Sequence, residues 1–228
     1  MSSLLSTADT TADTTADSRA DAADTARPAA GEATRRRLTE RQAATVQRVT
    51  EALIDELDEA GYDGLTVRNV ARRAGVSSAT AYTYFTSKAH LVAEVFWRRL
   101  VALPDTPAAP GQPAAARVAA VVRDVSVMVA GEPPLAAACS PALLGTDPDV
   151  RVLRDRIGAE LHRRLLAALT GDGTAPGRLP AGRDADLVEA LDFLVAGALL
   201  RAGTGHMSYD DLAERLASLV PLVIGDRP

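Results

Sequence analysis

The chain has 228 residues, of which 47% are hydrophobic and 4% aromatic, and its formal net charge is −5. This composition allows a sizeable core. No apolar run approaches the roughly 18 residues that a membrane helix needs, and the N-terminal residues lack the pattern of a secretory signal. A single cysteine, Cys139, excludes an internal disulfide and fits a reducing compartment. We therefore expect a cytoplasmic protein with no membrane partner.

The charge is distributed unevenly along the chain. Residues 1–34 carry two arginines against six acidic side chains (−4), residues 35–103 carry 11 basic against eight acidic (+3), and residues 104–228 carry 12 arginines against 16 acidic (−4). Attraction to phosphate acts locally, over about a Debye length of ~8 Å. The middle segment is the only basic one, and it is therefore the candidate for binding nucleic acid.

The first segment, residues 1–34, is an acidic low-complexity sequence. A Thr-Ala-Asp unit recurs every four residues and places Asp9, Asp13, Asp17 and Asp21 in register. On a helix these would be like charges at unfavourable i, i+4 positions, and the segment has almost no large apolar side chain. We predict a disordered tail. The alternative is an acidic segment that competes with DNA for the basic part of the chain.

A capping box begins the first predicted helix, with Thr39 as the N-cap and Gln42 at N3. The helix runs to Ala60 and is ended by Gly61. A basic cluster directly precedes it, formed by Arg35, Arg36 and Arg37. This cluster is either a solvated surface group or a flexible arm that reaches DNA phosphates or the minor groove.

Residues 65–91 have the layout of two short helices joined by a tight turn and followed by the start of another helix. Apolar side chains at i, i+3, i+4 and i+7 mark one face of the first, namely Val67, Val70, Ala71 and Ala74. Gly75 ends this helix, where a positive φ is inexpensive for glycine, and Ser77 can cap the next one. That helix, from Ser78 to about Phe85, offers mainly hydroxyl groups. The pattern indicates a helix-turn-helix, whose second helix enters a DNA major groove.

A proline-rich stretch, 104–113, separates this region from the rest of the chain. We predict a helix-turn-helix head at 35–103, including a fourth helix that links it to a helical body at 104–228. Asp147 and Ser208 are predicted N-caps in the body. Its predicted helices span about 113–131, 134–144, 147–170, 184–202 and 208–224, with Asp184 as the cap of the fourth and a mobile loop at 171–183. Because strand-like runs are lacking, the predicted fold class is all-α.

Several residues of the head stand at a characteristic spacing, namely Gly61, Tyr62, Thr66, Val67, Arg68, Ala71, the 74–77 turn, Tyr82, Phe85 and Lys88. In this set the head resembles the DNA-binding region of the tetracycline-repressor (TetR) family of bacterial transcription regulators. The body resembles the family only in its helical layout. The resemblance implies a non-enzymatic regulator that binds a double-stranded DNA operator and acts most often as a repressor.

The resemblance also implies which residues contact DNA. Thr66 and Lys88 lie at predicted helix N-termini, where backbone N–H groups favour a phosphate, and Arg68 matches a position that can reach DNA. Other candidates are Arg36 and Arg37 of the basic cluster and, in the turn and recognition helix, Ser77, Ser78, Ala79, Thr80, Tyr82, Thr83 and Tyr84. For Tyr82 and Phe85, a packing role is an equal alternative to DNA contact.

The last two predicted helices carry more apolar surface than one body can cover, because 184–202 is apolar nearly all round. A homodimer with a four-helix interface would bury this surface, as the last two helices do in the TetR family. Two heads related by a dimer axis imply a palindromic operator.

The family further implies that a small effector enters the body, changes the spacing of the heads and releases the operator. The candidate lining residues, each of which also fits a plain core role, are Val125, Met128, Leu135, Leu161, His162 and Phe193. Polar groups are few among them, and we therefore expect an apolar or amphipathic effector such as a lipid or an acyl thioester.

Two other classes of protein are weaker interpretations. An enzyme is disfavoured because the three histidines have no metal-ligand spacing, no Gly-rich phosphate loop is present, and Cys139 lies among apolar residues. We predict no catalytic residue, metal site or cofactor. An architectural DNA binder without a ligand would not need a helical body of this length, and equal affinity for all DNA sequences would favour it.

Overall fold

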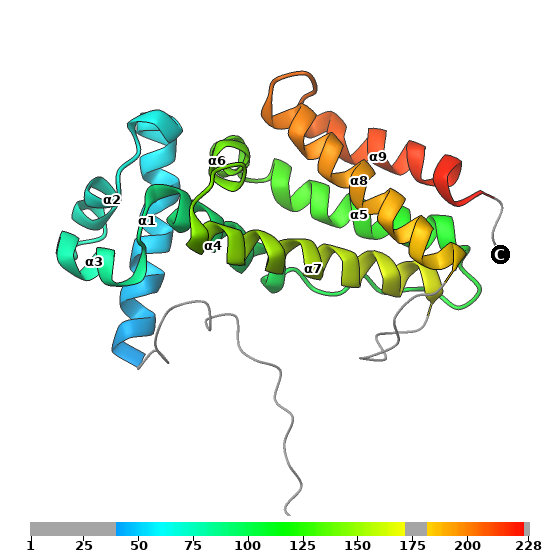
Figure 1. Cartoon of the computed structure of the whole chain (residues 1–228), viewed down its shortest axis with the longest axis horizontal. Helices are drawn as coiled ribbons and strands as arrows, with labels where there is room; N and C mark the ends of the chain where they lie inside the picture. The colour runs from blue at the N-terminus through cyan, green and yellow to red at the C-terminus, as the bar shows by residue number, and fades with distance from the viewer. Residues whose placement is uncertain (1–39, 172–181, 226–228) are drawn as a thin grey trace, which may run out of the picture.

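The structure is a computed structural model that describes residues 40–171 and 182–225. In these two ranges the chain forms nine α-helices and no strand (Figure 1). The predicted all-α fold class is therefore confirmed. The predicted acidic tail and most of the predicted loop at 171–183 lie outside the described residues. None of the described helices is long and apolar enough to span a membrane.

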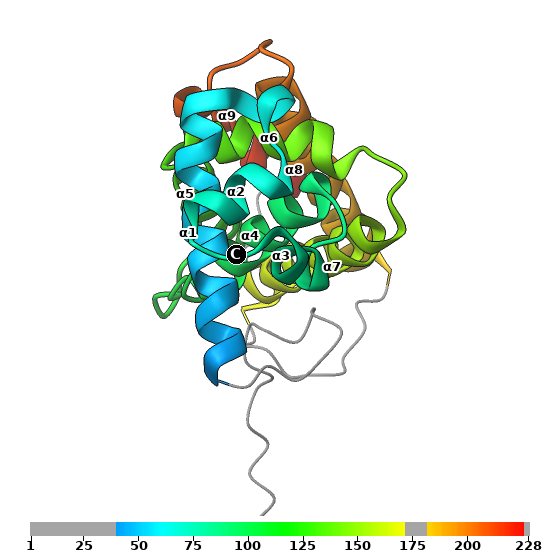
Figure 2. The same cartoon turned by 90° about the vertical axis from the view of Figure 1, so that its left-hand side faces the viewer.

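The helices follow the predicted order. The head contains α1 (Glu40–Gly64), α2 (Val67–Arg73), α3 (Ser78–Tyr84) and α4 (Lys88–Ala102). The body contains α5 (Ala114–Ala130), α6 (Pro133–Leu143), α7 (Pro148–Thr170), α8 (Arg183–Gly203) and α9 (Tyr209–Ile224). Figure 2 views the molecule from the head, with α1, α2 and α3 in front of the body helices.

The predicted break at Gly61 is present, because its φ of 61° and ψ of −179° are not helical, and a further turn beyond this kink extends α1 to Gly64. One helix start differs from the prediction. At α8 the N-cap is Gly182, with a φ of 59°, and Asp184 lies in the first turn. An acidic side chain in the first turn also interacts favourably with the positive end of the helix dipole. In the sequence, an aspartate in the first turn therefore resembles an aspartate at the N-cap.

Side-chain caps fix the starts of α2, α3, α4, α7 and α9. Thr66, Ser77 and Ser87 accept hydrogen bonds from the backbone N–H groups of Asn69 (3.1 Å), Thr80 (3.1 Å) and His90 (3.0 Å). Asp147 and Ser208 cap α7 and α9 in the same manner, as predicted. Each such cap contributes about 1 kcal/mol.

One hydrophobic core connects the head to the body. The buried face of α4 consists of Leu91, Val92, Val95, Phe96 and Leu100. These side chains belong to a single cluster with Val49 and Leu53 of α1 and with Leu135 and Ala142 of α6. A second core joins α5, α7, α8 and α9. Helix α4 packs against helices that precede the proline-rich stretch 104–113 and against helices that follow it. The division of the chain into two domains at this stretch therefore stays a prediction.

A buried arginine of α7 forms hydrogen bonds with the C-terminal end of α4. The Arg164 side chain is only 4% exposed. It donates to the carbonyl oxygens of Leu100 (3.2 Å), Leu103 (2.7 Å) and Pro104 (3.0 Å). These carbonyls lie at and just beyond the end of the helix, where carbonyls lack helical partners. Glu160 accepts from Arg164 Nε at 2.8 Å and balances the buried charge.

Helices α6 and α8 approach each other at Gly203. A Cβ atom at this position would lie 1.8 Å from Ser140 Oγ and 2.7 Å from Ser140 Cβ. The hydroxyl can rotate away, but the Cβ atom of Ser140 is fixed by its helix. Only glycine therefore fits without separating the two helices.

We expect Gly203→Ala to lower the free energy of unfolding by about 1–3 kcal/mol, because the added methyl group overpacks the α6–α8 contact. Denaturant unfolding measures the change. Gly158→Ala is the matched control, since nothing lies within 4 Å of a Cβ at that exposed position of α7, and it should stabilise by up to about 1 kcal/mol. Adding Ser140→Gly to Gly203→Ala should restore part of the loss. An unchanged stability of Gly203→Ala would contradict the close approach.

Candidate nucleic-acid interface

The recognition helix α3 presents small and hydroxyl-bearing side chains to solvent at the end of the head. Ala79 and Thr83 are exposed, and Tyr82 is 49% exposed. Ala81, on the opposite face, is fully buried against Val67 and Ala71 of α2. The residues predicted to read DNA and those that hold the helix in place thus lie on opposite faces.

Phe85 and Tyr82 differ clearly in burial. The sequence allowed either packing or DNA contact for both residues. Phe85 is fully buried beneath the end of α3, in the core shared with α1 and α4. Its ring centroid lies 6.0 Å from that of His90 in an edge-on arrangement. Tyr82 is exposed, and its contact with DNA stays a prediction.

Some hydroxyl groups of α3 are already engaged within the head. Ser77 Oγ and Thr80 Oγ1 lie 2.8 Å apart in a hydrogen bond, and Thr83 Oγ1 donates to the carbonyl of Ala79 at 3.0 Å. A hydroxyl that donates internally still has lone pairs for a base amino group. Exposed Arg68, on the first turn of α2, and exposed Thr66 flank the helix.

Lys88 has an internal role that the sequence did not reveal. Its ammonium donates to the carbonyl oxygens of Tyr62 (2.8 Å) and Asp63 (3.3 Å) and lies 4.4 Å from the centroid of the Tyr62 ring. These carbonyls belong to the turn that follows the kink at Gly61. The ammonium group has three donors, and contact with a DNA phosphate therefore stays a prediction.

Not all of the basic charge of the head faces outward. Arg73 of α2 pairs with two carboxylates of α1, with Nε 3.0 Å from Glu56 and Nη2 on Glu59. Arg48 donates to the carbonyl of Ala74 at 3.4 Å. These arginines fix α2 and its turn to α1. Arg36 and Arg37 of the predicted basic arm lie outside the described residues.

Four of the six predicted effector-lining residues lie in the core that joins head and body. Val125 and Leu135 are buried there, and Met128 and Leu161 pack against it. Met128 and Leu135 border a crevice of about 10 Å³, which is too small for an organic ligand. His162 lies apart, with its Nδ1 atom 2.7 Å from Asp192 Oδ2 in a contact between α7 and α8.

Phe193 does not lie in the interior with the other predicted residues. It is 70% exposed on the outer face of α8, because apolar side chains surround this helix and only part of them can face its own core. Because apolar residues occur on nearly every side of α8, the sequence did not show which side of the helix faces the core.

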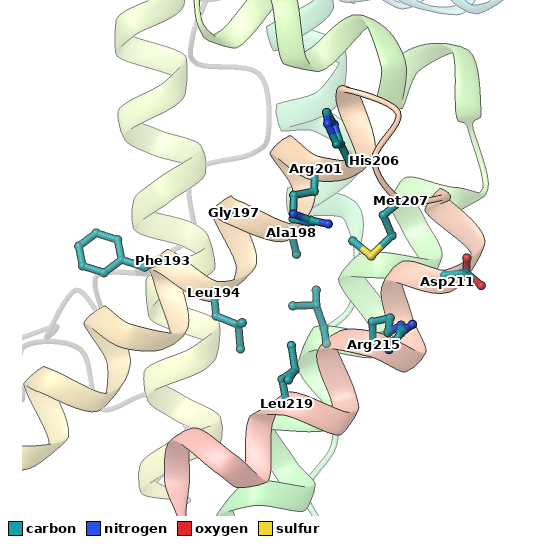
Figure 3. Close-up of a pocket in the computed structure, with 11 residues that line it drawn as sticks. Phe193, Leu194, Gly197, Ala198, Arg201, His206, Met207, Asp211, Arg215 and Leu219 are labelled. Atoms are coloured by element: carbon teal, nitrogen blue, oxygen red, sulfur yellow. The ribbon is translucent and has the colours of Figure 1, made fainter.

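A large apolar groove runs along this outer face between α8 and α9. Its volume is about 790 Å³. Its apolar lining consists of Phe193, Leu194, Gly197, Ala198, Met207, Leu216 and Leu219 (Figure 3). Charged and polar side chains also line it, namely Arg201, His206, Asp211 and Arg215. The sequence indicated surplus apolar surface here, but the groove depends on how α8 and α9 pack together.

The described residues contain no group of three or more His, Cys, Asp or Glu side chains that could hold a metal ion. Cys139 is buried among apolar side chains, and this burial raises the pKa of its thiol. A protonated thiol is a poor nucleophile. Neither feature provides a catalytic centre.

A helix-turn-helix head with a polar, exposed recognition helix, rigidly packed on a helical body, defines a DNA-binding regulator. A family profile described as "Bacterial regulatory proteins, tetR family" matches residues 49–95. The chain is 44% identical over 189 residues to Rv0767c, an uncharacterized HTH-type transcriptional regulator of Mycobacterium tuberculosis, with 81% of this chain and 82% of that protein covered. The chain therefore belongs to the TetR family of bacterial transcriptional regulators, and it is not an enzyme.

More distant relatives share its architecture. The HTH-type transcriptional repressor KstR of Rhodococcus jostii is 28% identical over 183 residues, which cover 79% of this chain and 82% of that protein. A TetR transcriptional regulator from Rhodococcus superimposes with a TM-score of 0.66 at 24% identity, covering 82% of this chain and 98% of that one. The regulator FadR of Bacillus subtilis, solved with stearoyl-CoA, gives a TM-score of 0.52 at 20% identity, with 78% and 97% covered. These two solved structures show the same fold.

We expect Lys88→Met to weaken binding to an operator selected from random DNA and to lower the slope of log K against log salt by about 0.9, because one phosphate contact is lost. The same change should cost about 1 kcal/mol of unfolding free energy through the lost bonds to the Tyr62 and Asp63 carbonyls. Fluorescence anisotropy over a salt series and denaturant unfolding measure the two effects.

Arg73→Met is the matched control for this change. It removes one positive charge that is paired with Glu56 and Glu59, and it should leave the salt slope unchanged while lowering stability. A Lys88→Met variant that loses stability but keeps the wild-type slope would restrict Lys88 to its role at the α1–α2 corner.

Proposed function

We propose that this protein is a repressor that binds a palindromic operator as a homodimer and is released by a small apolar or amphipathic effector. The observation that supports the dimer is the apolar surface exposed on the outer face of α8 and α9. Large apolar side chains are exposed there, namely Phe193, Leu200, Leu219 and Leu222, at 70%, 44%, 40% and 80%. Soluble monomers rarely expose apolar surface that is gathered in one place.

A second copy of this chain is the partner that fits this face. In a dimer with twofold symmetry the same patch meets itself, so that it must be self-complementary. Exposed Ala196 and Gly197 on α8 permit close approach of a neighbouring helix, and nothing lies within 4 Å of a Cβ at Gly197. The groove offers a place for the exposed Phe193 ring of the other copy, and Arg201, Asp211 and Arg215 provide charges of both signs.

The dimer supports the palindromic operator. Two heads related by a twofold axis present two α3 helices to successive turns of the major groove, about 34–36 Å apart. Specific contacts are expected from Ser78 and Ala79 and from the exposed Arg68. An architectural binder without sequence preference is the competing function. Comparable affinity for random and selected DNA at the same salt concentration would favour it.

The proposed effector is a long-chain acyl thioester or a similar lipid. FadR of Bacillus subtilis was solved with stearoyl-CoA, and KstR is named as a repressor. These descriptions apply to FadR and KstR themselves. For this chain, support comes from Met128 and Leu161, apolar side chains that are only partly buried where they pack against the core joining head and body. An effector can release DNA only if it binds the free state more tightly than the operator-bound state.

Leu222→Asp should convert the dimer into a monomer at micromolar concentration, because a carboxylate would be buried in an apolar interface. Sedimentation equilibrium measures the mass. Val127→Asp is the control, since Val127 is 59% exposed on α5 and lies outside the α8–α9 face. It should leave the mass unchanged. A wild-type protein that sediments as a monomer would contradict the proposed interface.

Stearoyl-CoA should raise the apparent Kd for the selected operator at least about tenfold, corresponding to about 1.4 kcal/mol of differential binding. Fluorescence anisotropy measures the release. Coenzyme A alone and stearate alone test whether both parts of the molecule are needed. If none of the three compounds changes operator binding, an acyl thioester is not the effector.

A further inference from the structure

The N-terminal ends of α4 and α7 are joined through their capping side chains. Ser87 caps α4, and its hydroxyl also donates to Asp147 Oδ2 at 2.6 Å. Asp147 in turn caps α7, because its Oδ1 atom accepts from the backbone N–H of Asp149 at 2.9 Å. Each of the two capping side chains thus serves its own helix and binds the cap of the other.

A second hydrogen bond lies beside the first. Thr86 Oγ1 donates to Asp149 Oδ2 at 2.8 Å. The hydrogen bond from Ser87 is the main cause that lowers the pKa of Asp147, and the N–H groups of Asp149 and Val150 lower it further. The carboxylate of Asp147 is therefore ionised at neutral pH, and a hydrogen bond to an ionised acceptor is stronger than one between neutral groups.

Helix α4 is fastened to α7 at its other end as well. Arg164 of α7 holds the carbonyls of Leu100, Leu103 and Pro104. Between the two ends, Ala93 packs with Val150 and Leu153 in a small buried cluster. Helices α4 and α7 therefore run side by side in the same direction, with polar contacts at both ends and apolar packing between them.

The contact at the N-terminal ends directly adjoins the recognition helix. α3 ends at Tyr84, Phe85 is fully buried, and Thr86 and Ser87 are the next two residues. Phe85 is the one residue between α3 and the hydrogen-bonded pair of Thr86 and Ser87. Because Phe85 is fixed in the core, this connection has no flexible residue. A displacement of the start of α7 would consequently be transmitted to the end of α3.

We propose that Asp147 and Asp149 are positioning residues for DNA binding, through which the body sets the distance between the two recognition helices of the dimer. This inference rests on the proposed function, because a fixed distance has a consequence only for two heads on a palindromic operator. The two carboxylates act through Thr86 and Ser87 and make no contact with DNA themselves. Their effect is therefore selectivity for the spacing between half-sites.

The double variant Thr86→Val/Asp147→Ser removes both hydrogen bonds. Valine has the shape of threonine without the donor, and serine still caps a helix but is too short to reach Ser87. Asp155→Ser is the matched control, because Asp155 is an exposed acid on the same helix and its loss changes the charge equally. Circular dichroism melting confirms that each variant is folded.

The measurement is operator affinity as a function of half-site spacing, with one or two base pairs inserted or removed, together with affinity for a single half-site. Wild type and Asp155→Ser should lose at least about tenfold in affinity per base pair of altered spacing, as for a lost specific contact. The double variant should lose no more than about threefold and should bind the single half-site as wild type does.

A second pair of variants provides an independent test. Asp149→Asn keeps an oxygen that accepts from Thr86, and it should retain the wild-type spacing profile. Asp149→Ala removes the acceptor and should flatten the profile. Retention of the wild-type profile by both Asp149→Ala and the double variant would overturn the inference. A wild-type protein without any spacing preference would instead refute the proposed binding of a palindrome by a dimer, and the two failures are thus distinguishable.

Discussion

The burial of α4 between the head and the body is the constraint on which the rest of the structure depends. Its apolar residues, from Leu91 to Leu100, belong to a core that contains side chains of both α1 and α6. Burying a large apolar side chain contributes about 1.5–3 kcal/mol, and several such residues cannot be withdrawn from one side without disturbing the other. The recognition helix α3, which is followed directly by α4, is therefore linked to the body through this shared core.

Apolar packing holds α4 in place, and the polar contacts define its position along α7. The hydrophobic effect is non-directional, whereas hydrogen bonds require fixed distances and directions. Ser87 and Arg164 supply such bonds at opposite ends of α4.

Local signals in the sequence predicted most of the fold, and contacts between distant segments limited the prediction of the site. The caps Thr66, Ser77, Asp147 and Ser208 were predicted correctly because each acts on its own helix within three residues. The bond between Ser87 and Asp147 joins residues 60 positions apart. The contacts of Lys88 with the end of α1 and the outward direction of Phe193 likewise depend on tertiary packing, which helix periodicity does not contain.

The same packing constrains how an effector can act. Because α4 is held to α7 at both ends, an effector that leaves α7 in place also leaves the recognition helix in place. The body side of α7 is linked to α8 by the contact between His162 and Asp192, and α8 carries the exposed face that a second copy would cover. The proposed effector would therefore act on one connected set of helices that reaches from the outer face of α8 to α3. Under this proposal, its differential affinity for two positions of α7 would determine release of DNA.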